Sequence, residues 1–271
     1  MAPSLAAPLA ERLFVTPISG RRPTREDVWA ENADRATIPS PLGPIPVWAW
    51  GDGPATVVLV HGWSGRGLQL AAFVEPLVGR GFRVVTHDAP GHGEAQGRTS
   101  SMPAFAATLG AVGRRFGPVS AVIAHSLGST AAIYALAQRE LVADRFVAIS
   151  PAARLHAIRE RFGEMTGFTP TVIDRMRAAF ETRLGFDWNA SEPLRLAPEM
   201  VMPSLVIHDA EDRFIPHSEG VELAEAWPEG RLITTAGLGH HRILRDPTVI
   251  DSVLSFVSES DEKNYMERKA S

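Results

Sequence analysis

The chain of 271 residues contains no cysteine. This absence excludes disulfide bonds, thiolate catalysis and metal sites with cysteine ligands, and it fits a reducing compartment. An excess of positive charge is also lacking, because the formal net charge is −4 at pH 7 and no run of lysine or arginine forms a stripe. Long-range attraction to a nucleic acid or an anionic membrane therefore has no visible source.

Long hydrophobic runs are missing as well. No stretch approaches 18 consecutive apolar residues, so we expect no transmembrane helix. The N-terminus has no basic residue before Arg12, and Pro3 and Pro8 break its short apolar run, so we expect no signal peptide. The sequence favours a cytoplasmic protein with one large domain. It is compatible with a homo-oligomer but does not indicate one.

Short apolar runs with the character of strands recur along the chain, and stretches with helical spacing separate most of them. The strand-like runs lie at 56–60, 82–86, 119–124, 145–149, 204–208 and 231–235, after two short ones that begin near residue 36. Continuous apolar strands that alternate with helices indicate a parallel sheet buried on both faces. We therefore predict an α/β protein with a mostly parallel, roughly eight-stranded sheet and helices on both faces.

The alternation fails once, in the segment 152–200, which reads as two or three helices. An apolar stripe with helical spacing runs along it: Val172, Ile173, Met176, Phe180 and Leu184. The segment leaves the sheet after the carboxyl end of a strand, the edge at which open α/β sheets bind ligands. We interpret 152–200 as a helical cap inserted into a core of residues 1–151 and 201–271, with a peripheral helical decoration as the alternative.

One junction in the sequence carries chemistry as well as shape. Residues 119–128 read V-S-A-V-I-A-H-S-L-G, an apolar strand that runs directly into Ser126 and then into a helix-compatible stretch. A nucleophilic serine on a sharp strand-to-helix turn has a strained backbone, and the turn crowds the residues two before and two after it. Here these are Ala124 and Gly128, both small. The pattern indicates a nucleophile; an ordinary loop with an incidental serine is the alternative.

A serine hydroxyl needs a base to accept its proton, and the base needs a carboxylate to orient it. The loop after the next-to-last predicted strand, D-A-E-D-R-F-I-P, contains Asp209 and Asp212. The loop after the last strand, A-G-L-G-H-H-R-I-L, contains His240 and His241. The order serine, acid, histidine is the one expected when the nucleophile stands on a strand-to-helix elbow.

With these residues, the sequence resembles the α/β-hydrolase fold superfamily, in its serine esterase and lipase-like branch with a helical cap, from about residue 45 to 258. The resemblance implies that the acid is Asp212, just before R-x-I-P, because Asp209 stands where the family usually carries glycine. It also implies that the base is His240, which follows G-L-G, with His241 as the alternative.

Negative charge that develops on a substrate carbonyl oxygen requires an oxyanion hole of two backbone N–H donors. One is expected from Leu127, immediately after the nucleophile. The segment V-L-V-H-G-W-S-G at 58–65 looks like the family's H-G-x segment and implies that Trp63 supplies the second. By the same resemblance, Gly62 lets the backbone approach and His61 orients the loop through hydrogen bonds.

The other histidines have structural interpretations. His125 is expected to pack beneath the elbow, and H-D-A-P-G-H-G resembles the family's D-x-P-G-x-G turn, in which Asp88 caps N–H groups. H-E-x-x-H is absent, the acids lack the spacing of metal ligands, and G-H-G-E-A-Q-G misses the dinucleotide motif G-x-G-x-x-G by one residue. We therefore predict no metal and no cofactor.

Serine at position 126 separates the chain from relatives that resemble haloalkane dehalogenases, with aspartate there, and dienelactone hydrolases, with cysteine. We predict an enzyme that hydrolyses small-molecule carboxylic esters with small to medium acyl groups through an acyl-enzyme. Aromatic side chains are expected to line the substrate pocket: Trp63, Phe214, Phe162, Phe168, Phe180 and Trp188.

The same triad serves other reactions, which the sequence does not separate. These are carbon–carbon bond hydrolysis, thioester hydrolysis, acyl transfer and cofactor-free perhydrolysis. A non-catalytic binding protein with this fold is the alternative from a different class. Such proteins commonly lose members of the triad, whereas this chain has all three candidate residue types.

Overall fold

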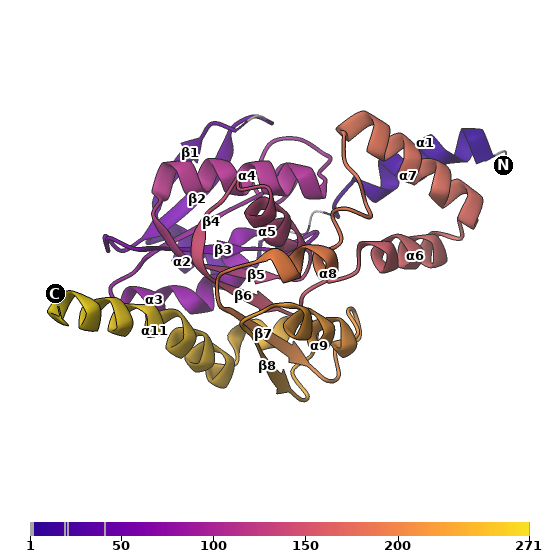
Figure 1. Cartoon of the computed structure of the whole chain (residues 1–271). Coiled ribbons are helices and arrows are strands. Elements are labelled where there is room, and N and C mark those ends of the chain that lie inside the picture. Colours follow the sequence, from indigo (N-terminus) through magenta and orange to yellow (C-terminus); the bar gives the residue numbers. More distant parts are fainter. Residues whose placement is uncertain (1–2, 19, 21, 41, 271) are drawn as a thin grey trace.

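The computed structural model describes residues 3–18, 20, 22–40 and 42–270, with residues 260–270 described by their backbone alone. Its centre is an eight-stranded sheet in the order β1-β2-β4-β3-β5-β6-β7-β8 (Figure 1). β2 pairs antiparallel with β1 and β4, and every other pair is parallel. The strands are β1 (Asp34–Ile38), β2 (Ile45–Trp50), β3 (Thr56–Val60), β4 (Arg83–His87), β5 (Val119–His125), β6 (Ala143–Ile149), β7 (Ser204–Asp209) and β8 (Gly230–Thr235).

Helices cover both faces of this sheet, and every residue of the central strands β3 and β5 is buried. Valine and isoleucine dominate these strands because β-branched side chains fit a pleated, buried surface. One hydrophobic core lies under α4 (Met102–Phe116), α5 (Leu127–Ala137) and α9 (His217–Ala226). The second lies on the opposite face under η2 (Gly67–Phe73), α3 (Val74–Val78) and α11 (Pro247–Ala270).

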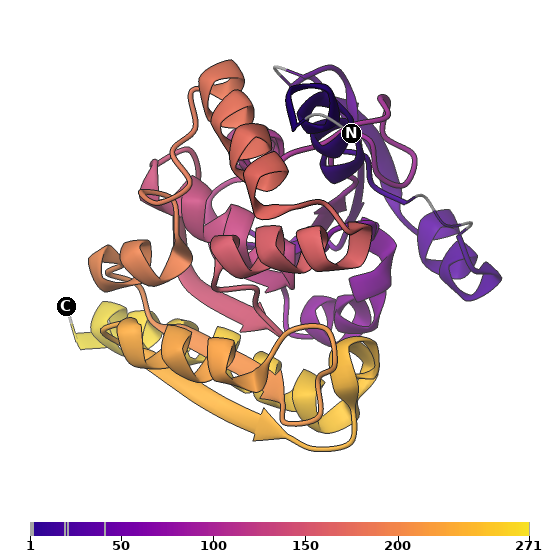
Figure 2. The same cartoon turned by 90° about the vertical axis from the view of Figure 1, so that its right-hand side faces the viewer.

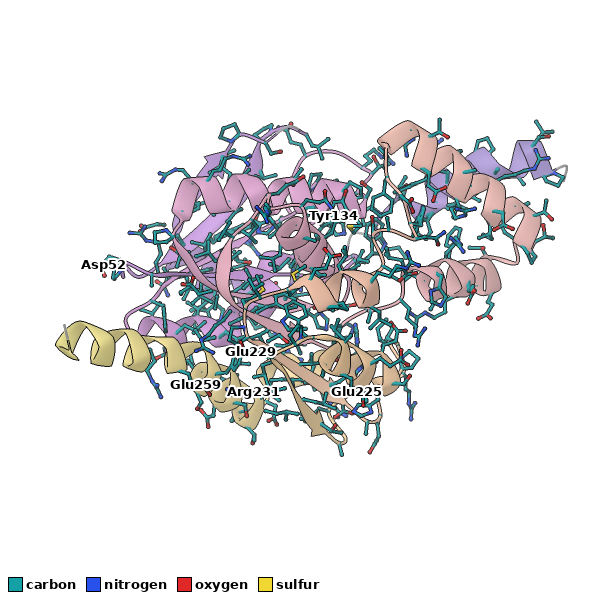
Figure 3. The ribbon with its side chains drawn as sticks, in the orientation of Figure 1. Asp52, Tyr134, Glu225, Glu229, Arg231 and Glu259 are labelled. Carbon is teal, nitrogen blue, oxygen red and sulfur yellow. The ribbon has the colours of Figure 1, made fainter. Side chains whose placement is uncertain are left out.

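Side chains fill the space between the sheet and its helices, as Figure 3 shows. Tyr134 of α5 is partly buried, with its ring centroid 5.6 Å from that of Phe186. At the periphery, Arg231 of β8 pairs with Glu259 of α11 at 2.8 Å between Nη1 and Oε1. α11 is thus joined to the edge of the sheet by a surface ion pair in addition to its buried apolar face.

An inserted helical region follows β6. It comprises α6 (Leu155–Thr166), α7 (Pro170–Leu184), α8 (Pro193–Leu196) and η3 (Ala197–Glu199). Glu192 positions its first helix, because the carboxylate accepts hydrogen bonds from the N–H groups of Leu155 and His156 at 2.7 and 2.9 Å. Glu219 of α9 accepts bonds from Ala153 and Arg154 in the same connection. Two carboxylates therefore define where the chain leaves the sheet.

The N-terminal helix α1 (Pro3–Phe14) packs against α7, beyond the sheet (Figures 1 and 2). Ala6 and Ala10 are buried in a small cluster with Val172, Ile173 and Met176 of α7. The apolar stripe recognised in the sequence thus faces a helix from the far end of the chain. The predicted α/β class, the mostly parallel eight-stranded sheet, the helices on both faces and the inserted helical region are confirmed.

Candidate active site

Ser126 occupies the turn between β5 and α5, with a φ of 54° and a ψ of −126°. A positive φ is strained for a residue with a Cβ atom, and this is the elbow that the sequence predicts. Ser126 N–H donates to the carbonyl of Ile149 at 3.0 Å. A Cβ atom on Gly128 would lie 2.3 Å from the carbonyl oxygen of His61, so only glycine fits there. Ser126 and Leu127 are partly exposed at this turn, whereas Ala124, His125 and Gly128 are buried.

Asp212 and His240 meet across two loops at the carboxyl edge of the sheet. Nδ1 of His240 lies 2.7 Å from Oδ2 of Asp212, and the Asp212 side chain is fully buried. The other oxygen, Oδ1, accepts the N–H groups of Phe214 and Ile215 at 2.8 and 3.0 Å. Two backbone donors thus hold the carboxylate so that one oxygen faces the imidazole, which stands in α10 (Gly239–Arg242).

Asp209, the other acid weighed from the sequence, has a different role. Its Oδ2 accepts a hydrogen bond from Thr235 Oγ1 at 2.8 Å and one from the N–H of Leu238 at 3.0 Å. Although burial opposes ionisation of Asp209, these bonds and others from the backbone lower its pKa. Asp209 therefore ties the end of β7 to the loop that carries His240. Asp212 is the carboxylate that contacts the imidazole.

His208 is part of the site and was not recognised from the sequence. Its Nε2 lies 3.5 Å from Asp212 Oδ2 and donates to the carbonyl of Ile215 at 3.1 Å. Burial opposes ionisation of Asp212, but the hydrogen bonds from His208 and His240 outweigh it and lower the pKa of this carboxyl. The available signal was a histidine inside the buried run S-L-V-I-H, where a polar side chain needs a partner.

His125 connects the nucleophile strand to the histidine loop. Its Nε2 donates to the backbone carbonyl of His240 at 2.9 Å, and the two ring centroids lie 4.6 Å apart. Burial lowers the pKa of His125 to about 3, so the ring is neutral at neutral pH. Among the residues that the structure describes, Ser126 Oγ has no hydrogen-bond partner. Catalytic hydrogen bonds often tighten only when substrate binds.

The two N–H donors expected to form an oxyanion hole belong to the turn after Ser126 and to the loop after β3. Leu127 is the first residue of α5, so its N–H has no acceptor within the helix. A Cβ atom on Gly62 would lie 2.9 Å from Ser126 Cβ, which shows how closely the loop after β3 approaches the elbow. His61 orients this loop, since Nδ1 donates to Gly62 O at 2.8 Å and Nε2 accepts the N–H of Ala89 at 3.1 Å. Trp63, the second expected donor, follows directly.

The loop after β4 has the structural role predicted for it. Asp88 accepts hydrogen bonds from the N–H groups of Gly67 and Glu94 at 2.7 and 2.8 Å. These two bonds fix the start of η2 and the turn that contains His92. The centroid of the His92 ring lies 5.1 Å from that of His61 and 5.1 Å from that of Trp63. Within the described part of the chain, no group of three or more histidine and acidic side chains is arranged to hold a metal ion.

The expected pocket residues divide into two groups. The Phe214 ring lies 5.2 Å from that of His240 and is 62% exposed, so it stands at the mouth of the site, and Trp63 is half-buried in the loop after β3. The other four rings contact one another or Phe14 of α1, and packing accounts for them: Phe162, Phe168, Phe180 and Trp188. A substrate contact at these four positions stays a prediction.

A comparison with known protein families matches residues 57–251, well over half of the chain, to the alpha/beta hydrolase family. The chain belongs to the alpha/beta hydrolase family. Membership implies a hydrolase that acts on a small-molecule substrate. No helix in the described part of this hydrolase is long and apolar enough to cross a bilayer.

Solved structures of low sequence identity share the fold of this hydrolase. An esterase from Thermogutta terrifontis is 18% identical over 85% of this chain and 99% of its own, with a TM-score of 0.61. A bromoperoxidase from Bacillus anthracis is 17% identical over 83% of this chain and 99% of its own, with a TM-score of 0.63. A candidate lipase from Acinetobacter baumannii is 15% identical over 89% of this chain and 95% of its own, with a TM-score of 0.66. These identities establish a shared fold and not a shared substrate. No curated protein matches the chain significantly.

Proposed function

We propose that this hydrolase cleaves carboxylic esters with small to medium acyl groups, with Ser126 as nucleophile, His240 as base and Asp212 as the group that orients the base. The 2.7 Å contact between Asp212 and His240 carries the proposal, because His125, next to Ser126 at the strained turn, bonds the backbone carbonyl of this same His240. Since the contact with Asp212 occupies Nδ1, Nε2 is the ring nitrogen left to accept the serine proton in this proposal. The shared fold of a solved esterase supports the same reaction class.

Two half-reactions follow from this arrangement. Ser126 Oγ attacks the ester carbonyl carbon and gives its proton to His240 Nε2. The bond between the carbonyl carbon and the alcohol oxygen then breaks, and that oxygen takes the proton from His240. In the second half, water gives a proton to His240 and attacks the acyl-enzyme, and the acid leaves as Ser126 regains its proton.

Charge on the carbonyl oxygen is expected to be stabilised by the N–H groups of Trp63 and Leu127. Removing one such donor typically costs about 10²–10³ in rate. His61 is a positioning residue in this proposal, because its Nδ1 bonds the carbonyl of Gly62 and its Nε2 bonds the N–H of Ala89, which ties the loop after β3 to the loop after β4.

We further propose that residues 152–200 act as a cap over a core formed by residues 1–151 and 201–271. The cap helices join the core through a cluster that includes Leu155 and Phe180 on one side and Met102 and Ala131 on the other. Access to Ser126 would then be limited by this packing, which favours small to medium acyl groups.

Two measurements test the nucleophile and the reaction together. A serine-directed fluorophosphonate probe is expected to label the wild-type protein and the control Ser255→Ala, which removes an exposed serine of α11, but not Ser126→Ala. A panel of p-nitrophenyl esters graded by acyl length reports ester hydrolysis, beside a thioester, a ring-cleavage diketone and hydrogen peroxide with an acid. Labelling without ester turnover would contradict the esterase proposal. No labelling of the wild type would favour a binding protein.

A further inference from the structure

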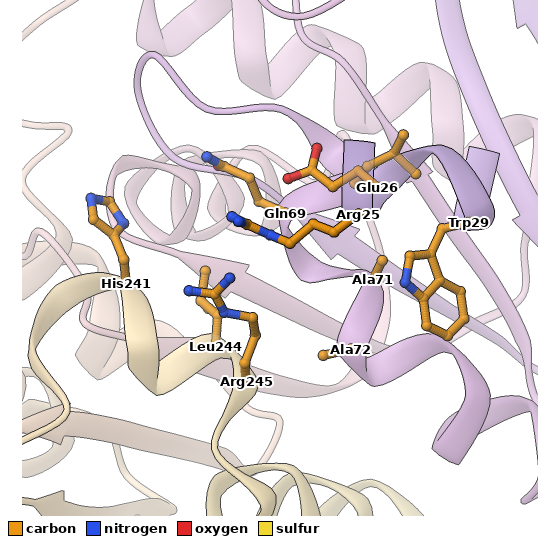
Figure 4. A pocket seen from close by; sticks show the side chains of 10 residues that line it. Arg25, Glu26, Trp29, Gln69, Ala71, Ala72, His241, Leu244 and Arg245 are labelled. Atoms are coloured by element: carbon orange, nitrogen blue, oxygen red, sulfur yellow. The ribbon is translucent and has the colours of Figure 1, made fainter. Parts of the chain in front are cut away.

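A pocket of about 360 Å³ lies next to the candidate triad, on the side of His241 (Figure 4). Two leucine and two alanine side chains give it an apolar lining, and the Trp29 indole stands at the end away from His241. Its polar groups come from Arg25, Glu26, Gln69, His241 and Arg245. The pocket therefore combines an apolar and aromatic body with a polar end.

Two positive charges in this pocket lack a counter-charge. Arg25 and Arg245 are exposed, and neither guanidinium group has an ion pair or hydrogen bond among the described residues. Figure 4 shows both guanidinium groups turned towards the end of the pocket where His241 lies. The single carboxylate, Glu26, is 4% exposed and already pairs with Arg66, at 2.7 Å between Oε1 and Nη2. The pocket as a whole is therefore cationic.

The N-terminal segment builds one wall. Arg25 and Glu26 belong to η1 (Thr24–Glu26) and Trp29 to α2 (Asp27–Glu31), all outside the segment 57–251 that matches the family. The carbonyl of Trp29 accepts the indole N–H of Trp50 in β2 at 3.2 Å, which fixes α2 against the sheet. The opposite wall comes from η4 (Ile243–Arg245), directly after the histidine loop.

The position of the pocket assigns it to one half of an ester. His241 lines the pocket and its ring lies 5.0 Å from that of His240, the proposed base. In ester hydrolysis the departing alcohol oxygen takes its proton from the base, so the alcohol half lies on the base's side of the nucleophile. The acyl half extends from the carbonyl carbon in the other direction, away from the departing oxygen.

We infer that the pocket holds the alcohol half of the substrate, and that this half carries a carboxylate which Arg25 and Arg245 bind. The inference rests on the proposed ester hydrolysis. Guanidinium groups pair with carboxylates through short, charge-assisted hydrogen bonds that are stronger than neutral ones. When the acyl carbon–oxygen bond breaks and the oxygen takes the proton of His240, the product that leaves the pocket is a hydroxy acid or phenolic acid.

Two matched esters test this substrate class. 3-Carboxy-4-nitrophenyl acetate has an anionic leaving group, and 3-carbamoyl-4-nitrophenyl acetate is its neutral counterpart. The wild type is expected to prefer the anionic ester in kcat/KM by roughly tenfold or more, because two charge-assisted bonds form. Arg25→Gln and Arg245→Gln should each lower the anionic-to-neutral ratio by roughly fivefold. Added salt should lower it too, since both arginines are exposed.

Arg139→Gln is the matched control, because it removes an exposed arginine at the opposite edge of the sheet, and it should keep the wild-type ratio. A ratio near one in the wild type, or a ratio unchanged in the double arginine variant, would overturn the inference. So would an equal preference for an ester whose carboxylate lies in the acyl half.

If neither ester is hydrolysed, the proposed function fails, and calorimetry of 3-carboxy-4-nitrophenol with Ser126→Ala tests the pocket alone. Binding that weakens in the arginine variants supports the pocket, and no binding refutes it.

Discussion

The carboxyl edge of the sheet and the outer helices (α1, α6 and α7) are held together by different kinds of contact. At the edge, buried carboxylates accept directed bonds from backbone donors within short loops, as Asp212 does from Phe214 and Ile215. In the outer helices, aromatic rings interlock instead. Phe14 of α1 lies 5.1 Å from Phe162 between ring centroids, and Phe180 lies 5.3 Å from Trp188.

Directed bonds and ring packing respond differently to substitution. A hydrogen bond requires a defined distance and angle, so one changed atom at the edge alters the geometry of the proposed reaction. Ring packing depends on volume, so a lost ring in the outer helices costs stability in proportion to the cavity that it leaves. We therefore expect changes at the edge to affect mainly activity, and changes in the outer helices to affect mainly stability.

The largest effect is expected from a pair of adjacent histidines at the edge. His240→Ala should lower kcat for a p-nitrophenyl ester by about 10⁵–10⁶-fold, because the members of a triad act as a unit. His241→Ala should lower it by less than about tenfold, because its ring has no bond to Asp212. The measurement is steady-state hydrolysis, with thermal melts to show that both variants fold. The reverse ranking would move the base to His241.

The two acids of the neighbouring loop give a second contrast. Asp212→Asn should lower kcat by about 10⁴-fold, because an amide no longer favours the required tautomer of His240. Asp209→Asn should instead lower the free energy of unfolding by about 1–3 kcal/mol, since it weakens buried bonds to Thr235 and Leu238. Hydrolysis assays and urea denaturation of both variants separate the two effects. A greater loss of kcat in Asp209→Asn would contradict the assignment.

Sequence alone predicted most of the carboxyl edge, for a physical reason. Parallel strands deliver their following loops to one edge, so strand order places Ser126 at the same edge as the loop of Asp209 and Asp212 and the loop of His240 and His241. Small residues at the elbow were also informative, because Gly128 packs against the backbone of His61. The preference for Asp212 over Asp209 came from the family resemblance.

Contacts between distant segments could not be predicted in this way. Nothing in the periodicity of residues 3–14 indicates that they pack against α7. An apolar helix face predicts that the face is buried, but it does not identify the element that buries it. The same limit applies to Phe180 and Trp188, because their spacing in the sequence is compatible both with a place in the hydrophobic core and with a place in the substrate pocket. The contribution of Arg25 to the wall of the pocket beside His241 was not predicted, because residues 1–35 show no pattern that assigns them to helices or strands.

Acid pH offers a third way to separate the two regions, because the edge contains several buried histidines. Burial lowers the pKa of His87 and His92 to about 4 and that of His125 to about 3, against about 6.5 in the unfolded chain. Between these values the unfolded state binds more protons, so stability falls as the pH falls below about 6.5. Burial raises the pKa of Asp88 to about 6, which opposes this trend by one proton.

Three histidines against one aspartate leave two net protons, and each contributes up to about 1.4 kcal/mol per pH unit. The net result should be a loss of roughly 5 kcal/mol in the free energy of unfolding between about pH 6.5 and 4.5. Urea denaturation across this range measures it. His87→Leu, which removes one of the buried groups, should make the dependence shallower. His156→Leu, in α6 of the outer helices, is the control. A flat profile in the wild type would show that these histidines are not what makes the edge sensitive to acid.

The smallest effect is expected in the outer helices. Phe14→Ala removes a half-buried ring that contacts Phe162 and Trp188, so it should lower the free energy of unfolding by about 2 kcal/mol. Leu13→Ala, which removes the neighbouring side chain that is 48% exposed, is the control and should change it by less than about 0.5 kcal/mol. Hydrolysis of a short-chain ester by Phe14→Ala should stay within about threefold of the wild type, because the rings hold helices and not reacting atoms. A large loss of kcat without a loss of stability would break the comparison, since the outer helices would then help to position the substrate itself.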